Sequence, residues 1–272
     1  MPKSEKNIKN PELPKSPGSN EHHQDSRDPR DPKTLRLTDP AYRYPGSGNL
    51  YWKKLQAIKP FAIADNACEL AERQFTLDPN RPLHVELGCN GGHVTLEWAK
   101  QNPNHQYIGI DWKFKQIFFA AEKAQLRGLT NATFMRAYLE RLQFIFSKNE
   151  VDFMYLFFPD PWPKKKQKKN RFLTTERLLT IHSLLKTGGI FHIKTDHAEY
   201  FDSMLEELKA VIAPPEKPNG ATEPSFEILE LTKNLHEKNE NARGLTIPDV
   251  TLFERIFIKQ GLPIHSLKLK AL

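Results

Sequence analysis

The sequence predicts an α/β fold in which a mostly parallel sheet of seven strands is covered by helices on both faces. Short apolar runs rich in β-branched or aromatic residues alternate with longer helical patterns, as in strands that are joined by crossover helices. Parallel strands are usually buried on both faces, so we expect helices on both sides of the sheet. The expected parallel strands are LHVEL (83–87), QYIGI (106–110), ATFMR (132–136), VDFMYLFF (151–158) and GIFHIKT (189–195).

Helical patterns separate these strands, and Gly, Asn or Pro residues stand where three of the helices should begin or end. Two further runs, FEILELT (226–232) and DVTLFERIFIKQ (249–260), predict an antiparallel hairpin that completes the sheet at its edge. The expected helices are 93–101, 112–128, 171–189 and 198–212, with another at 64–75 before the first strand.

The first 45 residues predict a disordered tail, and residues 46–272 predict a single domain. The tail holds eight of the 21 prolines, seven acidic and nine basic side chains, and almost no apolar residues before Leu35. Such a segment cannot bury enough apolar surface to offset the entropy lost on ordering. A second polar segment, 213–225, predicts a long surface loop.

The composition favours a polyanionic partner in the cytoplasm. The net charge is +7 and the isoelectric point is near 9.2, which leaves nucleic acid and a membrane surface as candidates. Cys68 and Cys89 are too few for a disulfide framework and lack zinc-site spacing, so we expect reduced thiols and no metal. The first residues lack the apolar core of a signal peptide, and no stretch approaches the roughly 18 apolar residues that span a bilayer.

A glycine-rich turn follows the first expected strand, at the edge where ligands bind in open α/β sheets. In VELGCNGGH (85–93), Glu86 ends the strand, and Gly88 and the two later glycines permit a tight turn with close approach of a ligand. Asp111 stands at the end of the second strand. Its carboxylate suits the paired hydroxyls of a ribose, because it accepts two hydrogen bonds at once.

Both a nicotinamide dinucleotide and S-adenosylmethionine carry such a ribose, and the turn favours S-adenosylmethionine. GCNGG is not GxGxxG, and Glu86 would repel a pyrophosphate but attract the ammonium and sulfonium groups of the methyl donor. Two structural alternatives remain: the glycines could serve strand-to-helix packing only, and Asp111 could be a helix N-cap.

The fourth expected strand ends in PDPW and leads directly into a basic run. Pro159 and Pro161 restrict the backbone on both sides of Asp160, and Trp162 offers a flat face for a base. KKKQKKNR (164–171) then adds six positive charges in eight positions. Alone, the run fits a solvated loop or a nuclear localisation signal, and Trp162 fits a core or lid residue. Their place at the ligand end of a central strand favours phosphate binding.

The segment LFFPDPWPKKKQKKNRF (156–172) closely resembles the corresponding motif of the bacterial tRNA (guanine-N7-)-methyltransferases. Other motifs of that family follow the same order: ELG (86–88), GID (109–111), TD (195–196) and TLFERIF (251–257). The resemblance extends from about residue 83 to the last residue. It implies a Rossmann-like, S-adenosylmethionine-dependent enzyme that methylates N7 of a guanine in tRNA, the variable-loop guanine at position 46.

The resemblance also implies two sets of site residues, with Asp160 as the catalytic residue. Tyr138 stands where many members have an acidic residue, and Pro163 where they have a histidine. The implied cofactor-binding residues are Glu86, Gly88, Asp111, Tyr138 and Asp160. The implied substrate-binding residues are Lys164, Asp196, Thr251, Leu252, Phe253 and Glu254.

The chemistry of N7 suggests how Asp160 would act. N7 of guanine carries a lone pair and no proton, so its methylation needs in-line positioning and stabilisation of a cationic base, not a general base. Asp160 is therefore expected to act electrostatically and by orientation. Asp196 could accept hydrogen bonds from guanine, or it could be a helix N-cap. The rival functions are methylation of another nucleotide and RNA binding without catalysis.

Overall fold

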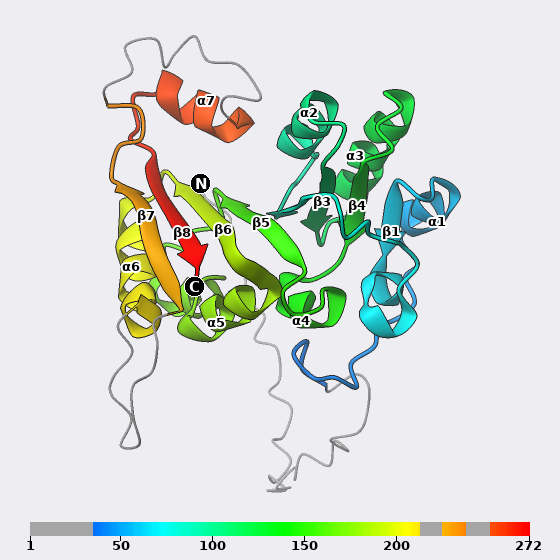
Figure 1. Cartoon of the computed structure of the whole chain (residues 1–272), viewed down its shortest axis with the longest axis horizontal. Coiled ribbons are helices and arrows are strands. Elements are labelled where there is room, and N and C mark those ends of the chain that lie inside the picture. Colours follow the sequence, from blue (N-terminus) through cyan, green and yellow to red (C-terminus); the bar gives the residue numbers. More distant parts are fainter. Residues whose placement is uncertain (1–34, 213–224, 238–250) are drawn as a thin grey trace, which may run out of the picture. The chain divides into compact units, whose positions relative to one another are not determined.

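The computed structural model describes residues 35–212, 225–237 and 251–272, and an eight-stranded sheet forms its centre (Figure 1). The strand order is β1-β4-β3-β2-β5-β6-β8-β7, in which β8 is antiparallel to β6 and β7 and the other pairs are parallel. The fold class is confirmed, with one strand more than expected. The strands are β1 (Ala62–Ala64), β2 (Leu83–Leu87), β3 (Gln106–Asp111), β4 (Ala132–Arg136), β5 (Val151–Phe157), β6 (Leu185–Thr195), β7 (Phe226–Thr232) and β8 (His265–Ala271).

Helices cover both faces of this sheet. One buried apolar cluster joins α1, α2 and α3 to β1, β3 and β4, and a second joins α4, α5 and α6 to the opposite face. The last helix, α7, lies beyond the strand ends (Figure 1). The helices are α1 (Leu50–Ala57), α2 (His93–Gln101), α3 (Phe114–Leu126), α4 (Leu142–Ile145), α5 (Thr175–Leu184), α6 (Ala198–Ile212) and α7 (Leu252–Lys259).

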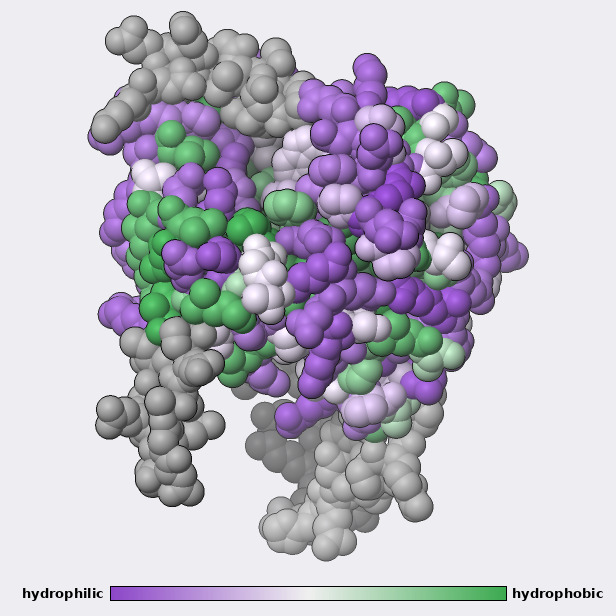
Figure 2. Space-filling model, viewed as in Figure 1, coloured by the Kyte–Doolittle hydropathy of each residue, from purple (hydrophilic) through white to green (hydrophobic). Residues whose placement is uncertain are grey.

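The expected strand at 249–260 is wrong, because its described part forms helix α7. Thr251 accepts a hydrogen bond from the Glu254 backbone N–H, and the Glu254 carboxylate accepts one from the Thr251 N–H, which makes a capping box. The edge hairpin forms instead between β7 and β8. Hydrophobic residues gather over β7 in Figure 2, where Ile228, Leu229 and Leu231 are exposed.

The expected helix at 64–75 is also wrong. Short 3-10 turns at Asp65–Cys68 and Leu70–Glu72 take its place after β1. Asp65 has a left-handed backbone, with φ of 60°, and its buried carboxylate forms an ion pair with Arg136 of β4. This tertiary contact favours a turn over a continuous helix.

Residues 36–45, which the sequence assigns to the disordered tail, pack against the domain. The Arg141 guanidinium donates hydrogen bonds to the backbone carbonyls of Leu37 and Asp39, and Tyr44 is buried. The expected boundary at residue 45 is therefore wrong, because a buried cation holds this segment. Residues 1–34 and 213–224 lie outside the described residues. Within the described ranges, no helix is long and apolar enough to cross a membrane.

We expect Gly92→Ala to lower the free energy of unfolding by about 3 kcal/mol or more, as measured by urea denaturation. Gly92 has φ of 67°, and an added Cβ would lie 2.5 Å from Cε1 of Phe134. Gly128→Ala is the matched control, because Gly128 has φ of 66° with nothing within 4 Å of an added Cβ. Its backbone strain alone should cost about 1 kcal/mol. Equal losses in the two variants would show that Phe134 makes room.

Candidate active site

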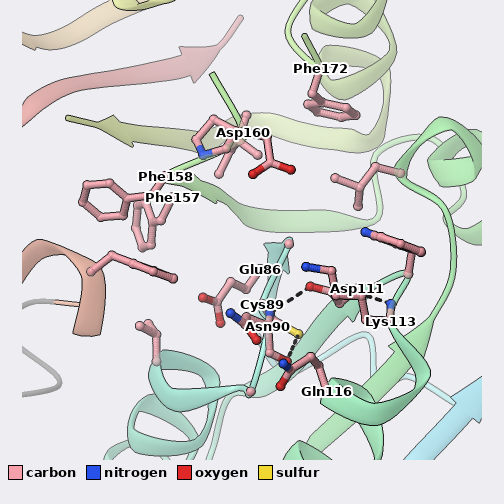
Figure 3. Close-up of a pocket in the computed structure, with 18 of the residues that line it drawn as sticks. Glu86, Cys89, Asn90, Asp111, Lys113, Gln116, Phe157, Phe158, Asp160 and Phe172 are labelled. Atoms are coloured by element: carbon pink, nitrogen blue, oxygen red, sulfur yellow. Dashed lines mark hydrogen bonds between the residues drawn. The ribbon is translucent and has the colours of Figure 1, made fainter. Parts of the chain in front are cut away.

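A cavity of about 720 Å³ lies at the carboxyl ends of β2, β3, β4 and β5 (Figure 3). Parallel strands end at the same edge, so residues far apart in the sequence meet there. Three residues expected to bind substrate do not line it: Lys164, Asp196 and Glu254. The expected site residues that do line it are Glu86, Gly88, Asp111, Tyr138, Asp160, Thr251, Leu252 and Phe253.

Glu86 places a buried carboxyl group in this cavity from the end of β2. Its Oε2 accepts hydrogen bonds from the backbone N–H of Thr95, at 3.2 Å, and from the Thr95 hydroxyl. Burial raises the pKa of Glu86 to about 7, although the Thr95 hydrogen bonds act in the opposite direction. A cation bound beside Glu86 would favour its ionised form. No pattern in the sequence pointed to Thr95 as its partner.

The glycine turn serves both packing and ligand access. Gly88 has φ of 73°, and no atom lies within 4 Å of the place where its Cβ would be. Space therefore remains beside its backbone in the cavity wall, whereas Gly92 is needed for packing against Phe134. Packing alone explains only part of the turn.

Asp111 joins the glycine turn to the start of α3. Its Oδ2 accepts a hydrogen bond from the backbone N–H of Asn90 at 3.1 Å, and its Oδ1 accepts one from that of Lys113 at 2.9 Å (Figure 3). Burial raises the pKa of Asp111, and these hydrogen bonds partly oppose the shift. The N-cap position of α3 is Lys113, so the alternative of Asp111 as an N-cap is wrong.

Tyr138 follows β4 and forms the next part of the cavity wall. Its ring is parallel to that of Tyr44, with centroids 5.6 Å apart and an interplanar angle of 7°. The Tyr138 backbone N–H donates to the Tyr44 hydroxyl at 3.0 Å. The sequence reasoning missed Tyr44 because it lies in the segment assigned to the tail. The pair of tyrosines at 42 and 44 was the available signal.

Asp160 and Glu86 reach into the cavity from opposite sides (Figure 3). Asp160 is exposed, so a bound substrate would have to cover its carboxylate to strengthen its field. Phe158 and Trp162, two residues before and after Asp160, have φ of 52° and 44°, a backbone conformation that residues other than glycine rarely adopt. The Phe158 N–H donates to the Lys194 carbonyl at 2.8 Å, which helps to hold this turn.

The basic run is fastened to the domain at its second half. Residues Lys165–Asn170 form a 3-10 helix, and the buried Arg171 donates to the Pro161 carbonyl at 2.9 Å. Arg171 and Lys168 both contact the Glu199 carboxylate at 2.7 Å. Among the described residues, the other lysines of the run have no ion-pair partner and are exposed. The run therefore presents positive charge from an anchored turn.

Asp196 follows β6, and the first turn of α6 uses another residue as its cap. The backbone N–H of Tyr200 donates to Nδ1 of His197 at 3.2 Å. The alternative of Asp196 as the N-cap is therefore wrong. Asp196 is half-buried and, among the described residues, accepts no hydrogen bond at its carboxylate.

Glu254 is fully buried and fastens α7 to the sheet. Both oxygens of its carboxylate lie 3.0 Å from Nζ of Lys194, and Oε1 lies 2.7 Å from Nε2 of His236. The expectation that Glu254 lies on an edge strand is wrong, and its carboxylate is enclosed by protein partners. Three preceding residues of the same motif line the cavity, namely Thr251, Leu252 and Phe253.

Comparison with known proteins shows that this chain is similar to methyltransferases. A family model described as "Putative methyltransferase" matches residues 80–267. A tRNA (guanine-N(7)-)-methyltransferase of Christiangramia forsetii is 32% identical over 212 residues, which cover 76% of this chain and 88% of that protein. The enzyme of that name from Bdellovibrio bacteriovorus is 28% identical over 72% of this chain and 86% of its own length. The chain also matches 32% of a longer bifunctional glycosyltransferase/methyltransferase of Fusobacterium nucleatum, at 30% identity.

Proposed function

Because the chain belongs to the tRNA (guanine-N(7)-)-methyltransferase family, we propose that it transfers a methyl group from S-adenosylmethionine to N7 of a guanine in tRNA. The observation that carries the proposal is one cavity that joins two buried carboxyl groups, a glycine turn and the exposed Asp160 beside a basic run. Methylation of another nucleotide and RNA binding without catalysis have less support, because the relatives' names specify guanine N7. An enzyme acting on tRNA would work in the cytoplasm.

The order of the strand ends supports a placement for the cofactor. Glu86 on β2, Asp111 on β3 and Tyr138 after β4 follow one another across neighbouring strands, which are about 4.8 Å apart. Glu86 and Gly88 would hold the methionine portion, Asp111 the ribose hydroxyls and Tyr138 the adenine. The bound cofactor supplies an electrophilic methyl group on a sulfonium.

Asp160 would then stabilise the cationic guanine as it forms. It lies across the cavity from Glu86, so it would face the base while Glu86 faces the cofactor. No proton leaves N7, so Asp160 needs only to remain ionised and correctly oriented. The strained turn and its flanking prolines support this orientation.

The surroundings of Asp160 suit an RNA substrate. Lys164 and the exposed lysines after it would contact phosphates, and Asp196 would accept hydrogen bonds from the guanine edge. Thr251, Leu252 and Phe253 would form the wall on the substrate side. Glu254 would act indirectly, by holding α7 in place through Lys194.

The test of this function is mass spectrometry of nucleosides after the protein has been incubated with unmodified tRNA and S-adenosylmethionine. We expect 7-methylguanosine as the product. A different methylated nucleoside would support the first rival function. Cofactor binding without any methylated product would support the second.

We expect Asp160→Asn to reduce kcat by about 100-fold, because the amide has no charge to stabilise the cationic base. The dissociation constants for S-adenosylmethionine and tRNA, measured by calorimetry and filter binding, should stay within about twofold. Asp202→Asn is the matched control, since Asp202 is an exposed carboxylate on α6 paired with Lys233. Unchanged turnover in Asp160→Asn would refute the electrostatic role.

The raised pKa of Glu86 predicts pH-dependent cofactor binding. With a pKa of about 7, Glu86 ionises mainly between pH 6 and pH 8, so affinity for the cationic cofactor should rise about tenfold over that range. In the unliganded protein the same ionisation should lower the free energy of unfolding as the pH rises from 4.5 to about 7. Burial lowers the pKa of His93, which also lines the cavity, so its titration is shifted toward lower pH than that of a free histidine.

Calorimetric titration at pH 6, 7 and 8 measures this effect, with Glu86→Gln as the matched variant. The glutamine keeps the shape and an acceptor for Thr95, but it should bind the cofactor weakly and almost equally at each pH. An equal wild-type affinity at pH 6 and pH 8 would contradict the role of Glu86.

Charge reversal in the basic run should weaken tRNA binding and its dependence on salt. Each of Lys165→Glu, Lys166→Glu and Lys169→Glu should reduce the slope of log K against log salt by about 0.7 to 0.9. The control is Lys209→Glu, which changes an exposed lysine on α6. Filter binding at several salt concentrations measures the slopes. Slopes equal to that of the wild type would support a merely solvated loop.

A further inference from the structure

We infer that residues 36–45, here named the strap, position Tyr138 and thereby set the affinity of the cavity for the adenine end of the cofactor. The inference rests on the proposed function, because it takes the cavity to bind S-adenosylmethionine. The strap and its partner Glu69 precede residues 80–267, which the family model matches. The inference therefore concerns a part of the chain to which the family match assigns no role.

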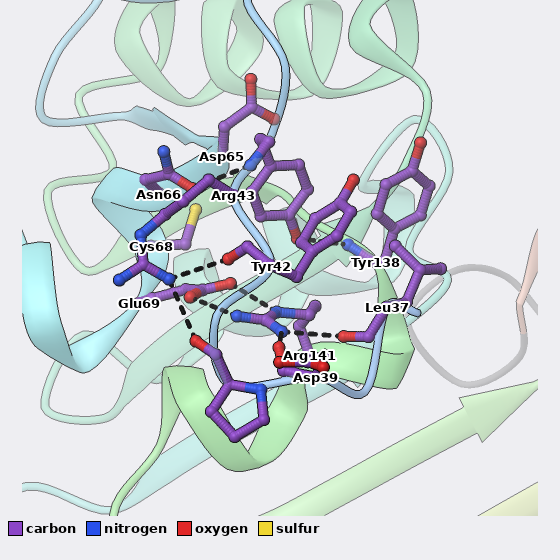
Figure 4. A network of polar contacts seen from close by, with 12 residues as sticks. Leu37, Asp39, Tyr42, Arg43, Asp65, Asn66, Cys68, Glu69, Tyr138 and Arg141 are labelled. Atoms are coloured by element: carbon purple, nitrogen blue, oxygen red, sulfur yellow. Dashed lines mark hydrogen bonds and ion pairs between the residues drawn. The ribbon is translucent and has the colours of Figure 1, made fainter. Parts of the chain in front are cut away.

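A buried cation clamps the strap onto the domain (Figure 4). The fully buried Arg141 donates to both oxygens of Glu69, from Nε and Nη2, at 2.7 Å each. Its Nη1 donates to the carbonyls of Leu37 at 2.8 Å and Asp39 at 2.6 Å. A buried guanidinium is stable only when its donors are satisfied, so Arg141 strongly favours this position of the strap.

The strap then brings Tyr44 against Tyr138. The Tyr44 backbone N–H donates to the side-chain oxygen of Asn66 at 3.1 Å, and its hydroxyl accepts from the Tyr138 N–H at 3.0 Å. The two rings are parallel, and the Tyr42 ring meets Tyr44 edge-on with centroids 5.4 Å apart. Tyr44 therefore contacts both the backbone and the ring of Tyr138.

Arg136 restrains the hydroxyl end of the same tyrosine. Its Nη2 donates to the Tyr138 hydroxyl at 3.3 Å, and its Nε donates to the Trp112 carbonyl at 3.0 Å. An ion pair with Asp65 holds the guanidinium. Between Arg136 and Tyr44, the Tyr138 ring has a fixed position in the cavity wall.

Tyr138 follows β4, one strand beyond the proposed ribose site at Asp111, so it would contact the adenine. A loss of Tyr44 would release Tyr138, and this should weaken cofactor binding and leave the chemical step intact. Tyr44 is therefore a positioning residue. In the proposed arrangement, the methyl group and Asp160 lie at the methionine end of the cofactor, away from the adenine. The KM for S-adenosylmethionine should rise, whereas kcat and the KM for tRNA should not change.

Steady-state kinetics of two variants of the full chain test this inference. Tyr44→Phe removes only the hydroxyl, and it should raise the KM for S-adenosylmethionine by about threefold. Tyr44→Leu also removes the ring, and it should raise this KM by about tenfold or more. In both variants, kcat at saturating cofactor and the KM for tRNA should stay within about twofold of the wild type.

Tyr42→Phe is the matched control, because it makes the same chemical change in the strap at a hydroxyl that has no hydrogen-bond partner among the described residues. Its kinetic constants should equal those of the wild type. If Tyr44→Leu does not fold, as judged by circular dichroism, Tyr44→Phe decides the question. An unchanged KM for the cofactor in the folded variant refutes the inference. A fall in kcat together with an equal rise in both KM values also refutes it.

Calorimetric titration with S-adenosylmethionine alone separates this inference from the proposed function. Weaker binding by Tyr44→Leu than by the wild type supports the strap. Equal binding refutes the strap and leaves the function intact. A wild type that binds the cofactor but makes no 7-methylguanosine refutes the function only, and one that binds no cofactor refutes both.

Discussion

The parallel hydrogen bonding of β2 to both β3 and β5 is the constraint on which the site depends. In that register Glu86 lies opposite Gly109 of β3 and Tyr155 of β5, so the ends of the three strands meet at one edge. Side chains from three separate parts of the sequence therefore reach one cavity without a long loop. A slip of one residue would move each side chain of β2 to the opposite face of the sheet, where it would not fit the residues packed there.

Local patterns were sufficient for much of the fold. Helices α2 and α6 have the bounds expected from their apolar periodicity, and β2 and β4 coincide with short β-branched or aromatic runs. The pattern at 249–260 was ambiguous, because apolar residues there fit either a strand or one face of a helix. The capping box of Thr251 and Glu254 decides for the helix, which leaves the pairing with β7 to β8.

The site was predictable where a residue ends a strand, and less so where a distant partner decides its role. Glu86, Asp111 and Asp160 stand directly at strand ends, so the topology places them at the cavity. Glu254 was expected on an edge strand, and its partner Lys194 lies 60 residues earlier, so no local pattern shows that its carboxylate is enclosed. Tyr44 belongs to a polar segment that Arg141 contacts from 102 residues beyond Asp39, and no local pattern in that segment indicates this contact.

The Arg141 clamp sets where the protein could be shortened. A chain cut at residue 80, where the family match begins, would lack Glu69 and the carbonyls of Leu37 and Asp39. The Arg141 guanidinium would then lose the partners that satisfy its charge in a dry environment. We therefore expect the smallest autonomous folding unit to begin before the matched residues 80–267, early enough to keep strand β1 and the carbonyls that Arg141 binds.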